Sequence, residues 1–65
     1  MSMIVVSDEI LIDSSNYKYF CIDPDGTLTM WTKDEEEFII CENANKFHLE
    51  KIAYGLANKE GYVVL

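Results

Sequence analysis

The residues best placed to do chemistry are two aspartates, Asp23 and Asp25, which follow an apolar run. Two carboxylates this close together could hold a divalent cation, as they do in calcium-binding EF-hand loops. Such a loop needs carboxylates at its first and twelfth positions. With Gly26 at the sixth position, those places fall on Cys21 and Thr32. We therefore expect no metal site and no cofactor here.

The segment Asp23-Pro24-Asp25-Gly26-Thr27-Leu28-Thr29 resembles the first motif of the haloacid dehalogenase-like phosphatases. The resemblance implies that Asp23 attacks phosphorus, that Asp25 acts as acid and base, and that Mg²⁺ bridges them to the phosphate. That family has a doubly wound fold, which a chain of 65 residues is too short to form. We therefore expect a non-enzymatic protein with a tight turn at this segment. Phosphatase-like chemistry at Asp23 and Asp25 is the alternative.

The turn predicts a hairpin over residues 17 to 32. Pro24 presets φ for a type I turn, and Gly26 allows the positive φ of a G1 bulge. The resulting register pairs Ile22 with Leu28, Cys21 with Thr29, Phe20 with Met30, Tyr19 with Trp31 and Lys18 with Thr32. Alternation then assigns the core face to Phe20, Ile22, Leu28 and Met30. The outer face receives Tyr17, Tyr19, Cys21, Thr27, Thr29 and Trp31.

The rest of the chain predicts further short strands and one helix. Residues 3 to 6 and 9 to 12 form one bent strand or two short ones, and residues 37 to 41 form another. A helix starts after Asn43 or Asn45 and runs to about Asn58. Its apolar stripe consists of Leu49, Ile52, Ala53, Leu56 and Ala57.

The chain then ends in a last predicted strand. Gly61 stops the helix, and residues 62 to 65 follow as the strand. If this strand pairs beside residues 37 to 41, the helix is a right-handed crossover. We expect one α+β domain over residues 1 to 65, in the order β-β-β-β-α-β. Its single small, mostly antiparallel sheet has four to six strands, with one helix packed on one face.

Charge and composition limit the possible partners. The chain has 12 acidic residues, 5 Lys and no Arg, for a net charge of −7. A polyanion or an anionic membrane repels such a chain, so we expect neither nucleic-acid nor membrane binding. The sequence has no targeting segment, which favours the cytoplasm. Cys21 and Cys41 lie in apolar runs and are expected to be buried free thiols, and the single His48 a surface residue without a role.

The predicted outer face is the best candidate for function. Tyr17, Tyr19 and Trp31 would be uncovered there, which is typical of a protein-binding hot spot. The run Asp34, Glu35, Glu36 and Glu37 would steer a basic partner. We expect a small acidic binding module, of the kind a phage or mobile element uses to inhibit a basic or nucleic-acid-handling protein. The alternative is a homo-oligomeric structural protein, such as a homodimer, that buries the same face.

Overall fold

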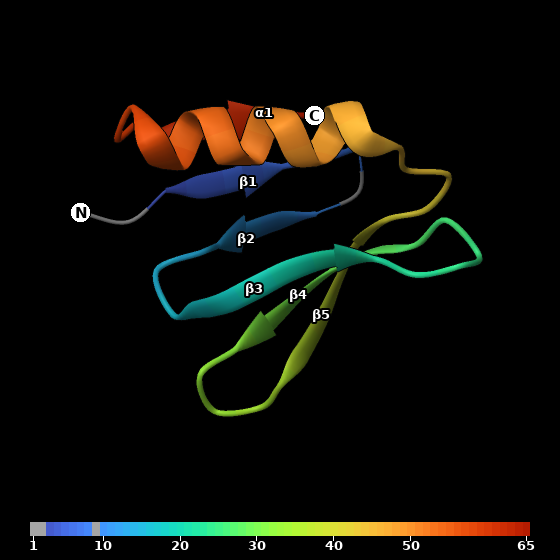
Figure 1. Cartoon of the computed structure of the whole chain (residues 1–65). Coiled ribbons are helices and arrows are strands. Elements are labelled where there is room, and N and C mark those ends of the chain that lie inside the picture. The colour runs from blue at the N-terminus through green and yellow to red at the C-terminus, as the bar shows by residue number, and fades with distance from the viewer. Residues whose placement is uncertain (1–2, 9) are drawn as a thin grey trace.

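The strands and the helix follow one another in the order shown in Figure 1. The computed structural model describes residues 3–8 and 10–65. In these residues the elements are β1 (Ile4–Val6), β2 (Leu11–Asp13), β3 (Tyr17–Ile22), β4 (Leu28–Thr32), β5 (Glu37–Cys41), α1 (Lys46–Ala57) and β6 (Tyr62–Val64). The first apolar segments are thus two strands, not one bent strand. Glu9, which the sequence assigned to the second strand, lies outside the described residues.

The six strands form two sheets of three, so the α+β class is confirmed but the single sheet is wrong. One sheet has the order β2-β1-β6, and the other has the order β3-β4-β5. The chain leaves the first sheet after Ser14. The Ser14 backbone N–H and Oγ both donate to the Met3 carbonyl, at 2.9 and 2.7 Å, which extends the β1–β2 pairing by one residue. Ser15 and Asn16 then form the turn that leads into β3.

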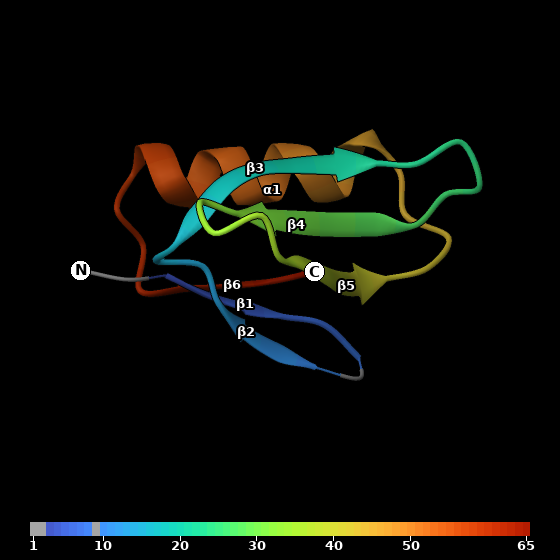
Figure 2. The same cartoon turned by 90° about the horizontal axis from the view of Figure 1, so that it is seen from below.

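Strand β6 pairs with β1 in parallel, and the expected place beside residues 37 to 41 is wrong. β1 has room for it because β2 occupies only one of its two edges. The helix carries the chain from β5 back to that open edge. Figure 1 shows α1 on the β1 side of the molecule and β3, β4 and β5 on the β2 side. In Figure 2, seen from below, β3 passes in front of α1, and β1, β2 and β6 lie to one side of them.

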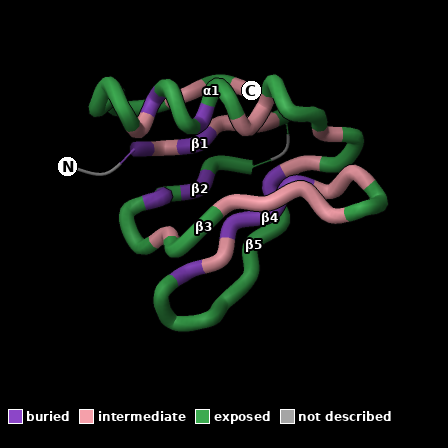
Figure 3. Tube along the Cα trace, viewed as in Figure 1, coloured by how far each residue is buried: buried purple, intermediate pink, exposed green. Residues whose placement is uncertain are grey.

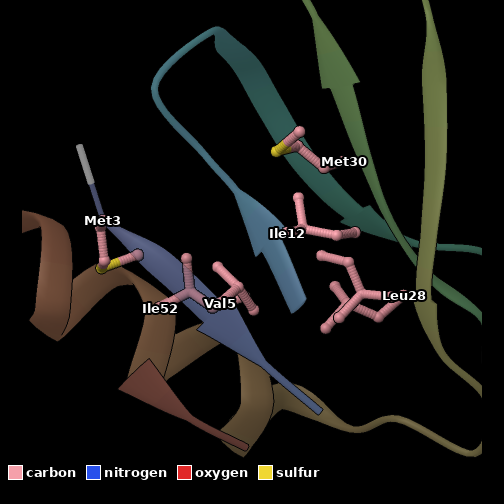
Figure 4. Packing of buried hydrophobic residues seen from close by; sticks show 7 residues of the cluster. Met3, Val5, Ile12, Leu28, Met30 and Ile52 are labelled. Atoms are coloured by element: carbon pink, nitrogen blue, oxygen red, sulfur yellow. The ribbon is translucent and has the colours of Figure 1, made fainter. Parts of the chain in front are cut away.

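Both sheets and the helix share one hydrophobic core, whose buried stretches Figure 3 marks in purple. Figure 4 shows its packing. The buried hydrophobic residues are Met3, Val5, Ile12, Leu28, Met30, Ile40 and Ile52. These residues are far apart in the sequence, so burying them on folding stabilises the two sheets together. No helix in the described part of the chain is long and apolar enough to cross a membrane.

The helix begins with a reciprocal capping box. The Asn45 side chain accepts the Phe47 N–H at 2.9 Å, and the His48 Nδ1 accepts the Asn45 N–H at 3.0 Å. These bonds satisfy backbone donors that no helical carbonyl can reach. Asn45, rather than Asn43, is therefore the N-cap. His48 is half-buried, and its role is to cap the helix.

The helix ends before it reaches the predicted glycine stop. Lys59 adopts the left-handed conformation, with φ of 54°. The Glu60 N–H donates to the Gly55 carbonyl at 2.9 Å, and the Lys59 N–H donates to the Leu56 carbonyl at 3.3 Å. This is the Schellman arrangement, which glycine usually closes. Here Lys59 closes it, so the role assigned to Gly61 is wrong.

The predicted apolar stripe of the helix is partly wrong. Ile52 is buried, but Ala53 and Ala57 are exposed, and Gly55 is buried in their place. A Cβ at Gly55 would lie 2.8 Å from the Met3 Sδ, which is closer than real contacts allow. The missing side chain lets the helix lie close to Met3 and to Val63 of β6, so the contact line runs through Gly55 and not through the alanines.

Candidate partner-binding surface

Tyr19 and Trp31 form an aromatic pair on the outer face of the β3-β4-β5 sheet. They are direct cross-strand neighbours, and their rings stack with centroids 6.3 Å apart. The predicted register is confirmed here and for the three pairs towards the turn. Tyr19 is 46% exposed, while Trp31 is half-buried. Both side chains therefore leave apolar surface open to a partner, Tyr19 more than Trp31.

Tyr17 does not belong to this surface, contrary to the sequence prediction. It pairs with Thr32, because a β-bulge inserts Lys18 between Tyr17 and Tyr19. The predicted pair of Lys18 with Thr32 is therefore wrong. The extra residue reverses the facing of everything before it in the strand. Tyr17 consequently packs against the core, with its ring 5.3 Å from that of Phe20.

The acidic run after β4 lies in the tight turn between β4 and β5 and at the start of β5, and all four of its residues are exposed. Glu37 begins β5 directly opposite Trp31, so their side chains share a face. Asp34 is held elsewhere: its Oδ2 accepts a hydrogen bond from the Asn16 amide at 2.8 Å. Glu36 closes the hairpin through its backbone carbonyl, which accepts the Thr32 N–H at 2.9 Å.

Glu35 has the most unusual backbone of the four acids. Its φ of 64° lies in the left-handed region, which favours glycine. Its N–H donates to the Thr32 carbonyl at 3.0 Å. The Oγ1 of the same threonine accepts the N–H groups of Asp34 and Glu36, at 3.2 and 3.1 Å. These bonds hold Glu35 in place despite the strain.

The turn and the aromatic pair enclose a shallow groove of about 260 Å³. Its lining residues are Lys18, Tyr19, Trp31, Thr32 and Glu35. An aromatic face attracts a cation through its π electrons, and a carboxylate attracts it by charge. The groove therefore has the chemistry to hold a basic side chain. The groove brings together Tyr19, Trp31 and Glu35, and Glu37 lies opposite Trp31 on the same face. The other predicted residues, Tyr17, Asp34 and Glu36, do not line the groove.

One member of the outer face, Ile39, was not predicted from the sequence. It lies opposite Thr29 on the central strand and is 58% exposed. The signal that could have found it was alternation along the strand, which puts Ile39 on the same side as Glu37. Thr29 itself is buried, and its Oγ1 lies 3.1 Å from the Cys21 Sγ. The outer face thus continues as an apolar surface beyond the aromatic pair.

The segment that resembles a phosphatase motif forms the predicted turn. The Asp23 carbonyl accepts the Gly26 N–H at 2.8 Å, and the Asp25 Oδ1 accepts the Thr27 N–H at 3.1 Å. Gly26 has a φ of 89°, as a G1 bulge requires. Among the described residues, no three His, Cys, Asp or Glu side chains gather closely enough to hold a metal ion.

The two cysteines are free thiols, as expected, but both are half-buried rather than buried. Burial raises the pKa of the Cys41 thiol, and the Asp8 carboxylate raises this pKa further. A raised pKa keeps the thiol protonated and makes it a weaker nucleophile.

Comparison with protein-family models, with curated proteins and with solved structures finds no match to this chain. Its function is therefore inferred from the surface chemistry alone.

Proposed function

We propose that this chain is a non-enzymatic protein-binding module that docks on a basic partner through Tyr19, Trp31 and the carboxylates of Glu35 and Glu37. The groove would receive a Lys or Arg side chain of the partner. The partner class that fits best is a nucleic-acid-handling protein, because such proteins present basic clefts. A small acidic chain that fills such a cleft would inhibit the partner, as phage-type inhibitors do.

The observation that carries this proposal is the position of Glu35. A glutamate in the left-handed region costs folding free energy that a glycine there would not. In the described part of the chain, Glu35 lines the same groove as the Tyr19–Trp31 pair. Strained residues kept beside an open apolar surface are typical of binding sites.

Charge supports the same partner class. Residues 1 to 42 contain 10 acidic residues and 2 Lys, a net charge of −8, and this part includes all of the groove. Long-range attraction would raise the association rate with a basic partner, and it would weaken as salt rises.

The test uses Trp31 as its own reporter, since the chain has a single tryptophan. Its fluorescence is titrated with an Arg-rich peptide, and with the same peptide carrying neutral citrulline. The variant Glu35→Gln with Glu37→Gln should lose about tenfold in affinity for the Arg peptide, and Tyr19→Ala a similar amount.

The matched control removes two charges elsewhere on the exposed surface, by Glu42→Gln with Glu60→Gln. We expect its affinity to stay within about twofold of the unmodified chain, because remote charges are screened at physiological salt. Equal losses in both double variants would mean that only net charge attracts the peptide. Equal binding of the citrulline peptide would refute a cation-binding groove. Affinity capture from the native host, with Tyr19→Ala as the negative bait, then identifies the partner.

A further inference from the structure

Strand β6 has an open edge that can accept another strand. On either side of β6, the Gly61 carbonyl accepts the Ile4 N–H at 3.0 Å and the Leu65 N–H donates to the Val6 carbonyl at 2.9 Å. Backbone groups alternate in direction along a strand. The N–H and C=O groups of Tyr62 and Val64 therefore point away from β1. Within residues 3–8 and 10–65, no strand lies on that side.

The flank of α1 next to this edge is apolar and exposed. Phe47, Glu50, Lys51 and Tyr54 line an open groove of about 320 Å³ together with Val63. Phe47 is 61% exposed and Tyr54 is 66% exposed. A strand added to β6 would lie beneath this flank, so the helix surface and the strand edge form one continuous docking surface.

The four helix residues are arranged symmetrically about one point. Phe47 and Tyr54 are equally far from the midpoint between Glu50 and Lys51. In a two-fold symmetric interface, if one residue contacts another, the second contacts the first across the axis. An axis beside this midpoint would bring Phe47 against Tyr54 of a second copy, and Glu50 against Lys51. Both contacts are complementary, and each occurs twice.

The same axis also suits β6. Val63 lines the groove with all four helix residues, so it would lie at the centre of the strand pair. Antiparallel pairing about Val63 places Tyr62 opposite Val64 of the second copy. These are the residues whose backbone groups point outwards, and directly opposed residues of this kind exchange both of their N–H···O bonds. Two such pairs would form.

We propose that the chain forms a two-fold symmetric dimer in which β6 pairs with β6 of a second copy and the two α1 helices pack side by side. The charge of this part of the chain is compatible with self-association here. Residues 43 to 65 contain 3 Lys and 2 acidic residues, a net charge of +1, against −8 for the remainder. Two copies can therefore meet here with little repulsion.

This dimer does not depend on the proposed partner-binding groove. Tyr19 and Trp31 lie on the β3-β4-β5 sheet, whereas β6 is an edge strand of the separate β2-β1-β6 sheet. A dimer formed through β6 would leave both grooves open and would carry two partner-binding sites. A dimer that buried the aromatic pair would instead block them.

Sedimentation equilibrium of charge-reversal variants tests the helix contacts. Glu50→Lys alone would place two lysine side chains together across the axis, and Lys51→Glu alone would place two glutamate side chains together. Each single variant should weaken the dimer by about tenfold. The double variant, Glu50→Lys with Lys51→Glu, restores opposite charges and should return to within about twofold of the unmodified chain. Far-ultraviolet circular dichroism checks that all variants fold.

Val64→Pro tests the strand edge. It removes an N–H that points away from β1, and proline is tolerated at such edge positions, so the monomer should fold while dimerisation is lost. Val64→Thr keeps the N–H and should still dimerise. A chain that stays monomeric at about 1 mM would overturn the proposal. So would a dimer that ignores both sets of changes and dissociates on Tyr19→Ala, because it would use the aromatic face instead.

Discussion

Two hairpin turns hold the ends of β4, and they share one backbone geometry. In the β3–β4 turn the Asp23 carbonyl accepts the Gly26 N–H at 2.8 Å, and in the β4–β5 turn the Thr32 carbonyl accepts the Glu35 N–H at 3.0 Å. In both turns, the residue three positions after the one whose carbonyl accepts this bond adopts the left-handed conformation. That residue is a glycine in the first turn, with φ of 89°, and a glutamate in the second, with φ of 64°.

The difference separates a turn whose residue suits its backbone from a turn whose residue is strained. Gly26 adopts its conformation without a steric penalty, and its carbonyl accepts the Ala44 N–H at 2.8 Å, which ties the turn to the start of the helix. For Glu35 the same conformation costs about 1 kcal/mol. Among the described residues, the Glu35 side chain makes no hydrogen bond or ion pair that would offset this cost, and it borders the Tyr19–Trp31 groove.

The largest effect is expected at Thr32, which holds the strained turn. Its side chain is only 3% exposed, and its Oγ1 accepts two backbone N–H groups. Thr32→Val leaves both donors without this partner and should lower the free energy of unfolding by about 2 kcal/mol in a urea titration. Thr32→Ser keeps the hydroxyl and should lose less than half as much. In the other turn, Asp25→Ala removes one exposed bond to Thr27 and should cost less than about 1 kcal/mol.

The next effect compares the two left-handed positions directly. Gly26→Ala forces a side chain into positive φ and should lower the free energy of unfolding by about 1.5 kcal/mol. Space is not the cause, because the nearest atom to a Cβ there, the Asn43 Cα, would be 3.7 Å away. An unchanged midpoint in the urea titration would show that this turn tolerates strain as well as its counterpart does.

Glu35→Gly should act in the opposite direction and stabilise the chain by about 1 kcal/mol. The matched control is Lys59→Gly, since Lys59 also has a positive φ, at 54°, and lies outside the groove. Both variants should raise the urea midpoint, but only Glu35→Gly should weaken binding of the Arg-rich peptide. If neither variant gains stability, the left-handed residues are not strained, and the case for a functional Glu35 loses its basis.

In the β3–β4 hairpin, the sequence predicts the turn far better than it predicts the open end, where the bulge at Lys18 lies. Pro24 and Gly26 determine their own backbone angles, so the turn and four cross-strand pairs follow from local chemistry. The bulge at Lys18 does not, because it depends on Tyr17 packing beside Phe20 against the folded core. That tertiary packing moved one of the three predicted aromatic anchors off the candidate surface.

Other features also escape the sequence rules. Lys59 and Glu35 occupy left-handed positions that these rules assign to glycine, so residue type alone does not predict their backbone conformation. Ser14 bonds to Met3, eleven residues away, and extends the β1–β2 pairing up to the turn into the second sheet. Gly55, which propensity alone disfavours in a helix, lies against Met3 and against Val63 of β6. Local signals predicted the elements, while their assembly depended on contacts between residues distant in sequence.

The smallest predicted effect is on the reactivity of the Cys41 thiol, which can distinguish the two turns. Burial raises the pKa of the Cys41 thiol, and the Asp8 carboxylate raises it further. The thiolate is the reactive form, so the folded chain should react with iodoacetamide near about pH 8 more slowly at Cys41 than the unfolded chain does. Asp8→Asn should accelerate the reaction. The same shift means that the free energy of unfolding falls as pH rises above about 8.5, since the unfolded thiol ionises first.

Cys41 ends β5, close to where the Ala44 N–H bonds to the Gly26 carbonyl. Loosening the first turn by Gly26→Ala should therefore expose the thiol more often and increase its alkylation rate, by about threefold, as measured on the isolated peptide by mass spectrometry. Glu35→Gly alters the turn at the opposite end of β5 and should leave that rate unchanged or lower. Equal acceleration in both variants would mean that the sheet opens as one unit. The two turns would then not act on separate parts of the molecule, and strain at Glu35 could not be assigned to the groove alone.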